Sequence, residues 1–455
     1  MMKIRSFEFL KARIQNVHPR TRKAHFNTIL GLAVKGGGIL ISLLLVPLTI
    51  DYLSKDTYGT WLTISSIVTM LTFLDIGIGN GLRNKFSEAI TTHNTTLARA
   101  YVSTAYLIFG VLQLAFAILF LLLFRYIPWQ RVFNTTIEIE QLQEVVLITV
   151  IAMAIKLVLD ILSYVLLALQ ESGQVGLINL LSNVLILIGT YTLTRFTNGN
   201  LFYLAIITAC SPVIVLLISG IALYQNQLKI YRPSFRLADL AYARSLLSLG
   251  YKFFFIQIAF VTLFYTDNLI ITQLFGPAEV TTYNIAFRYF NAISTIFAIA
   301  ITPYWTAFTE ASVKKDTLWM KKTYSYLQKL WVVLVSIVIL MILASNIVYS
   351  LWVGDRVFIP LKLSIGMGLS AIVIGWNVIT AAITNGLGKI KLQLYFSIVA
   401  AIINVPLAIF FGKSLDLGIT GVILATIASL IGGTILGSWQ VYKLLHGTAD
   451  GIWNE

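Results

Sequence analysis

Residues 100–124 read AYVSTAYLIFGVLQLAFAILFLLLF, an unbroken stretch without a charged side chain. An α-helix needs about 20 apolar residues to cross the hydrocarbon core of a bilayer. The same character extends over the whole chain of 455 residues, of which 58% are hydrophobic and only 11% charged. Soluble domains have about 25% charged residues. The sequence therefore predicts an all-α integral membrane protein.

Twelve apolar blocks of this kind follow one another along the chain. They cover residues 27–50, 58–78, 100–124, 144–169, 174–194, 200–224, 247–273, 282–307, 328–350, 360–384, 393–411 and 418–441. Phe86-Ser87-Glu88-Ala89 and Phe308-Thr309-Glu310-Ala311 lie about half a chain apart and resemble each other. This repeat suggests two pseudo-symmetric six-helix lobes around a central cavity, over 27–224 and 247–441, joined by a linker at 225–246.

The distribution of basic residues predicts how the chain is oriented. Outside the predicted helices, roughly three quarters of the Lys and Arg fall on the side that holds both termini. Both termini, including the tail 442–455, are therefore expected in the cytoplasm. Residues 1–26 alternate basic and apolar side chains at helical spacing, which predicts a helix lying on the anionic inner leaflet. This topology explains the net charge of +14, so no nucleic-acid partner is predicted.

Signatures of cofactor and enzyme chemistry are missing from the sequence. A single cysteine, Cys210, excludes a disulfide within the chain and a cysteine metal cluster. The four histidines fall outside the predicted helices, which argues against haem. No nucleotide-binding or hydrolase motif is found. The sequence predicts a protein that is not an enzyme, has no cofactor or metal, and draws energy from a gradient or from its cargo.

Four cations lie inside predicted helices: Lys35, Lys156, Lys252 and Arg288. A charge at the bilayer centre costs about 3 kcal/mol on insertion scales, so it normally faces a bundle interior or a watery cavity. These four residues are candidate ligands for an anionic substrate in one cavity between the lobes. Lys252 and Lys35 have an alternative, which is to extend to the inner membrane surface. Three glycines follow Lys35. They fit a bent helix that presents Lys35 to a cavity, or close packing of helices with Lys35 extended to the membrane surface.

Three carboxylates are candidates for coupling or gating. Asp160 follows Lys156 by four residues and shares its helix face, as a neutral pair or as one that opens to bind cargo or a proton. Asp267 and Arg288 fall at similar depth on consecutive helices, which suggests a pair, either structural or a gate. Asp75 lies in a glycine-rich stretch, where it would order a turn or carry a coupling ion.

One motif resembles a known family. Tyr58-Gly59-Thr60-Trp61, preceded by Leu53 and followed by Phe73-Leu74-Asp75-Ile76-Gly77-Ile78-Gly79-Asn80, resembles the opening of the polysaccharide-transporter (Wzx-type) flippases. The basic N-terminus, the twelve blocks and the half-chain repeat agree with this resemblance. Their superfamily includes multidrug and toxic-compound extruders and lipid II flippases.

The resemblance implies a function as well as a fold. It implies alternating access between two lobes that moves a polyprenyl-pyrophosphate-linked oligosaccharide to the outer leaflet of a bacterial plasma membrane, for surface polysaccharide assembly. Membrane lipids would surround the protein, a proton or sodium ion would be the coupling ion, and a polysaccharide polymerase would be a partner. Only Asp75 matches the motif of the family among the candidate site residues.

Three other functions remain open from the sequence. A cation-coupled multidrug exporter of the same superfamily would need an excess of buried carboxylates, whereas cations outnumber them here. A membrane glycosyltransferase or polymerase of the same pathway is the second. A polymerase would be expected to carry a large external loop, and the longest here is about 125–143. A membrane scaffold has no need of charges inside its helices.

The predicted orientation can be tested with reporter fusions. A fusion within 126–142 should report the outside of the cell, and one within 226–245 the cytoplasm. The reason is the excess of Lys and Arg on the side of the termini. The reverse pattern would overturn the topology.

Overall fold

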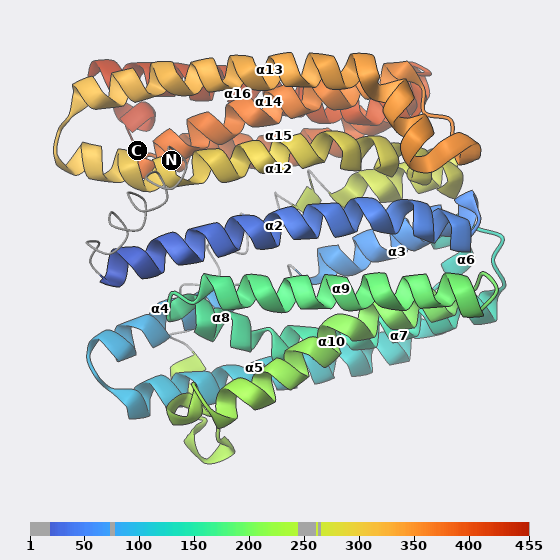
Figure 1. The fold of residues 1–455 in the computed structure, drawn as a ribbon, viewed down its shortest axis with the longest axis horizontal. Coiled ribbons are helices and arrows are strands. Elements are labelled where there is room, and N and C mark those ends of the chain that lie inside the picture. Colours follow the sequence, from blue (N-terminus) through green and yellow to red (C-terminus); the bar gives the residue numbers. More distant parts are fainter. Residues whose placement is uncertain (1–18, 73–77, 244–260, 263–264, 455) are drawn as a thin grey trace, which may run out of the picture.

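The computed structural model describes residues 19–72, 78–243, 261–262 and 265–454. All long elements in these parts are helices, and strands are absent from them (Figure 1). The predicted all-α membrane fold is confirmed. Two of the candidate residues, Asp75 and Lys252, lie outside the described residues.

The N-terminal group of helices extends to residue 225. It consists of α2 (Pro19–Tyr52), α3 (Lys55–Thr72), α4 (Ile78–Thr91), α5 (Thr95–Phe124), α6 (Trp129–Val132), α7 (Ile139–Leu159), α8 (Ile161–Ala168), α9 (Ser172–Phe196) and α10 (Leu201–Gln225). A linker with three short 3₁₀ turns follows, at Lys229–Tyr231, Phe235–Leu237 and Leu240–Tyr242.

The C-terminal group begins with helical residues 265–275. It continues through α12 (Pro277–Val313), α13 (Thr317–Val353), the 3₁₀ turn Gly354–Arg356, α14 (Leu361–Gly386), α15 (Lys391–Ile409), the π-turn Phe410–Ser414, α16 (Gly418–His446) and a last 3₁₀ turn, Gly451–Asn454. Figure 1 shows α12 to α16 on one side of the molecule and α4 to α10 on the other, with α2 between them.

Ten helices in the described residues are long and apolar enough to cross a membrane. Each corresponds to one of the twelve predicted blocks. The remaining blocks, 58–78 and 247–273, both contain residues outside the described parts. The count of twelve and the pseudo-symmetry of the two halves therefore stay predictions.

The helix ends follow from local sequence. The side chains of Asn94 and Asn200 accept hydrogen bonds from backbone N–H groups in the first turns of α5 and α10, which such residues do well. Pro277 opens α12, where its missing N–H costs nothing. Gly447 ends α16 in the left-handed conformation, with φ of 71°.

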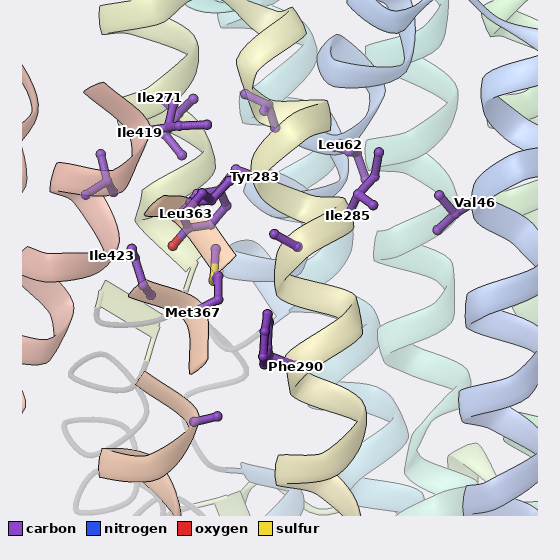
Figure 2. Packing of buried hydrophobic residues seen from close by; sticks show 14 of the residues in the cluster. Val46, Leu62, Ile271, Tyr283, Ile285, Phe290, Leu363, Met367, Ile419 and Ile423 are labelled. Carbon is purple, nitrogen blue, oxygen red and sulfur yellow. The ribbon is translucent and has the colours of Figure 1, made fainter. Parts of the chain in front are cut away.

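One hydrophobic core joins the two groups of helices. It contains Val46 and Leu62 from the N-terminal group together with Ile285, Phe290 and Met367 from the C-terminal group. Figure 2 shows Leu62 of α3 close to Ile285 of α12, with Met367 on the far side of α12. The contact between α3 and α12 is therefore part of the core that joins the two groups of helices.

The backbones of α3 and α12 meet at Gly59. A Cβ atom on Gly59 would lie 1.7 Å from the carbonyl oxygen of Pro277, so only glycine fits there. Thr63 and Thr272 share a hydrogen bond of 2.6 Å one turn further on. The Thr281 hydroxyl also donates to the Lys55 carbonyl, at 2.7 Å. These contacts gather where α2 ends and where α3 and α12 begin.

Replacing Gly59 should weaken this contact. Gly59→Ala should lower the free energy of unfolding by about 1–3 kcal/mol, because the added methyl group overlaps backbone rather than a movable side chain. Thermal unfolding of the purified protein in detergent measures the effect. Gly36→Ala is the matched control, since a Cβ there meets nothing within 4 Å. Equal shifts in both variants would show that the α3–α12 contact is not tight.

Candidate functional site

A cavity of about 450 Å³ lies among the N-terminal helices and is completed by α12. Lys156 of α7 and Arg288 of α12 both line it, so two of the four predicted cations share one cavity. Its remaining polar lining is neutral and consists mostly of hydroxyl groups, from Thr49, Tyr58, Ser65, Thr69, Thr72, Thr149, Thr190 and Thr208, with the indole of Trp61. The cavity therefore combines positive charge with many hydrogen-bonding groups.

The predicted pair of Lys156 and Asp160 is present. The Lys156 ammonium group bonds the Asp160 carboxylate, and the two side chains are 33% and 23% exposed. The sequence suggested one helix over 144–169, but α7 ends at Leu159 and α8 begins at Ile161, so Asp160 occupies the junction. The chain continues in helical geometry through this junction, since the Asp160 N–H donates to the Lys156 carbonyl at 2.8 Å and the Asp160 carbonyl accepts from the Tyr164 N–H at 3.3 Å.

Arg288 bridges the two groups of helices. Its Nη1 donates to the carbonyl oxygen of Ser42 at 3.0 Å and to the Ser42 hydroxyl at 2.8 Å. Ser42 belongs to α2. A guanidinium has five N–H donors, so this contact leaves others for a ligand in the cavity.

Two prolines free backbone carbonyls around this site. Pro47 has no N–H, so the carbonyl of Leu43 loses its helical partner. The indole Nε1 of Trp352, on α13, donates to that carbonyl at 2.9 Å. Pro212 likewise frees the carbonyl of Thr208, and both residues line the cavity. A membrane interior tolerates such breaks only where protein or water supplies a partner.

The predicted pair of Asp267 and Arg288 is wrong. Asp267 is buried and accepts a hydrogen bond of 2.5 Å from the Tyr283 hydroxyl. Its other oxygen has no partner among the described residues. Tyr283 and Arg288 are five residues apart on α12, which turns their side chains about 140° from each other. The sequence placed Asp267 and Arg288 at a similar depth in the membrane, but their side chains face different neighbours.

Lys35 does not join the cavity. Its side chain is exposed and is not part of the lining. The prediction that it shares one cavity with Lys156 and Arg288 is therefore wrong for this structure. Gly37 and Gly38 pack on α9, since Cβ atoms there would lie 3.2 Å from Leu180 and 3.8 Å from Asn183. This is the close helix packing that the sequence left as the alternative.

Several cavity residues were not identified from the sequence. Tyr58 and Trp61 belong to the motif that indicated the family, and both face the cavity. Thr190 is fully buried, and its hydroxyl finds no hydrogen-bond partner within the part of the chain that the structure describes. An unpaired hydroxyl beside a cavity is available to a ligand or water. Threonines in apolar helices are too common for this role to be recognised in advance.

A comparison with protein families gives one match. The model of a family described as "Polysaccharide biosynthesis protein" matches residues 26–309. Among curated proteins, no significant match is found.

Solved structures of transporters share the fold. An inward-facing multidrug resistance MATE family transporter of the MOP superfamily gives a TM-score of 0.76 at 15% identity, covering 93% of this chain and 100% of that one. The lipid II flippase MurJ in an inward closed conformation gives 0.71 at 17% identity, over 91% and 87%. An outward-facing MATE transporter gives 0.61 at 14% identity, over 93% and 95%. At these identities the similarity shows the fold alone, which this chain shares with these transporters.

Removing one member of the Lys156–Asp160 pair should cost more stability than removing both charges. Lys156→Gln or Asp160→Asn alone should lower the free energy of unfolding by about 2 kcal/mol, because an unpaired charge remains in a low-dielectric site. The double variant should recover at least half of that loss. Thermal unfolding of the three purified variants measures this. A double variant as unstable as the sum of the singles would mean that the charges do not neutralise each other.

Proposed function

The chain belongs to the polysaccharide biosynthesis protein family, and we propose that it is a flippase for a polyprenyl-pyrophosphate-linked oligosaccharide. The cargo would move from the cytoplasmic to the outer leaflet of a bacterial plasma membrane, for assembly of a surface polysaccharide. Both termini would lie in the cytoplasm, and a polysaccharide polymerase would receive the product.

The observation that carries this proposal is the charge of the cavity. Lys156 is neutralised by Asp160, whereas the described residues place no carboxylate against Arg288. The site therefore has an excess of positive charge inside low-dielectric walls, which strengthens its attraction for an anion. A pyrophosphate suits this charge, and a guanidinium binds phosphate oxygens through paired hydrogen bonds.

The neutral lining suits the sugar part of the cargo. Hydroxyl groups and the rings of Tyr58 and Trp61 surround the two cations. Sugars offer hydroxyl groups and apolar faces, and both find partners in such a lining. The polyprenyl chain would remain in the lipid, because nothing in its chemistry requires the polar cavity.

The contacts between the two groups of helices fit alternating access. Several of them gather around Gly59, Thr63 and Pro277, at the end that the charge distribution assigns to the outside, and the bond of Arg288 to Ser42 lies deeper. The similarity is also higher to an inward-facing than to an outward-facing transporter. We infer a state that is closed to the outside and receives cargo from the cytoplasm.

The other candidate residues take proposed roles around this cycle. Lys35 and Lys252 would attract the pyrophosphate on its way to the cavity, and Arg288 would hold it. Asp160 would release Lys156 to the cargo. Asp75 and Asp267 would be the sites for a coupling proton or sodium ion. No step in this scheme requires an enzyme active site.

Export of cationic drugs is the second candidate function, because a multidrug transporter shares the fold with a TM-score of 0.76. Its substrates would need a cavity with excess negative charge. Lys156 and Arg288 are the charged residues of the described lining, and Asp160, which bonds Lys156 without lining the cavity, leaves one positive charge in excess. The charge of the site therefore favours the flippase.

Complementation of a strain that lacks its endogenous flippase tests the proposal. Arg288→Ala should reduce surface polysaccharide more than tenfold, since a charge-assisted hydrogen bond contributes about 1.5–3 kcal/mol. Arg288→Lys should retain more activity than Arg288→Gln, because charge is the required property. Arg125→Gln, at an exposed position outside the cavity, is the matched control.

Membrane-inserted protein must be quantified in each strain, because Arg288 also bonds Ser42. Full polysaccharide levels with normally expressed Arg288→Ala would contradict the proposal. Drug resistance conferred by the unsubstituted chain, without polysaccharide rescue, would favour the exporter.

A further inference from the structure

A second cavity of about 270 Å³ opens between α5 and α10. Figure 1 shows these helices on the side of the molecule away from α12 to α16. Leu159, Leu162 and Leu216 give the cavity an apolar floor and wall. Leu217 and Ile221 of α10, which also line it, are 48% and 52% exposed. The cavity is therefore a groove on the surface that faces lipid.

Gly220 gives the groove its depth. A Cβ at this position would have Leu162, at 3.8 Å, as its only neighbour within 4 Å among the atoms compared. A larger side chain here would fill the groove without overlapping the backbone.

The groove has a polar end at the level of the linker. Tyr106, Tyr224 and Arg232 line this end, and the Tyr106 hydroxyl donates to the Tyr224 hydroxyl at 3.4 Å. The carbonyl oxygen of Arg232 accepts a hydrogen bond of 2.7 Å from Nε of Arg99. The Arg232 guanidinium itself has no hydrogen-bond or ion-pair partner in the described ranges. It is exposed and free to bind a ligand.

The linker around Arg232 has the character of a membrane interface. Phe235 and Leu240 are 91% and 68% exposed. Two cations belong to the same linker: Arg236 directly follows Phe235, and Lys229 precedes Phe235 by six residues. The linker is tied to α5, since the backbone N–H of Ser234 donates to the Ser103 hydroxyl at 3.0 Å. Apolar side chains and cations exposed together are typical of a segment that rests on an anionic leaflet.

We propose that the groove is a binding site for an anionic phospholipid of the inner leaflet. One acyl chain would lie along Leu159, Leu216 and Gly220, and Arg232 would bind the phosphate, whose charge in an anionic lipid is not balanced by a choline ammonium group. Basic pockets between membrane helices on the cytoplasmic side bind anionic headgroups in this way. The groove shares no lining residue with the cavity of Lys156 and Arg288, and the proposed lipid stays bound there rather than being transported. Its binding would fix the linker against α5.

Native mass spectrometry of the full chain in detergent tests the site. Phosphatidylglycerol and phosphatidylcholine with identical acyl chains are titrated in parallel. Phosphatidylglycerol should bind the unsubstituted protein about fivefold more tightly, the contribution expected of one cation near an anionic headgroup. Arg232→Gln should remove this preference, whereas Arg236→Gln, a cation outside the groove, should keep it.

A second pair of variants tests the acyl-chain part. Gly220→Leu should reduce binding of both lipids, because the side chain occupies the groove. Gly432→Leu on α16, where a Cβ meets nothing within 4 Å, should leave binding unchanged. Unfolding temperatures should confirm that both variants are folded.

Three results would overturn the proposal. The first is equal binding of the two lipids, and the second is a preference for phosphatidylglycerol that survives Arg232→Gln. The third is displacement of phosphatidylglycerol by an equal concentration of polyprenyl phosphate, which would assign the groove to the cargo lipid. None of these results depends on transport activity, so failure here is distinguishable from failure of the flippase proposal.

Discussion

A backbone carbonyl that loses its helical partner inside a membrane has to be bonded by another part of the protein. Pro47 creates this situation in α2, and the indole of Trp352 resolves it at the Leu43 carbonyl. Arg288 bonds the neighbouring residue, Ser42. Two donors from the C-terminal helices thus hold one turn of α2. The cavity depends on this contact, because it fixes the only cation that α12 contributes to the described lining.

The same contact connects the cavity to the arrangement of the helices. Arg288 belongs both to the lining and to the junction with α2. An anion that bonded the remaining N–H groups of Arg288 would share the guanidinium with Ser42, so its binding can change the strength of that junction. Conformational coupling requires this kind of differential interaction between two states. The Arg288 charge, which we propose binds the cargo, is therefore also placed where it can influence which state is favoured.

The sequence predicted the properties that depend on distance along the chain. It did not predict those that depend on how each helix is rotated about its own axis. Apolar length identified the ten spans, and a separation of four residues identified the pair of Lys156 and Asp160. Asp267 and Arg288 lie at equal depth but do not form a pair. The face of α12 that is turned toward Asp267 carries Tyr283, whose hydroxyl donates a hydrogen bond to the Asp267 carboxylate. The bond from Trp352 to Leu43 joins residues 309 positions apart, and no local pattern indicates it.

The meeting of α3 and α12 at Gly59 has a consequence for how such a protein can vary. Side-chain contacts can be exchanged in pairs, since a larger residue on one side is accommodated by a smaller one on the other. Here the partner of Gly59 is the carbonyl oxygen of Pro277, an atom that every amino acid carries. No substitution at position 277 can make room. Genetic suppressors of a Gly59 variant would therefore have to shift the whole helix, and they should map to the segments that set its position.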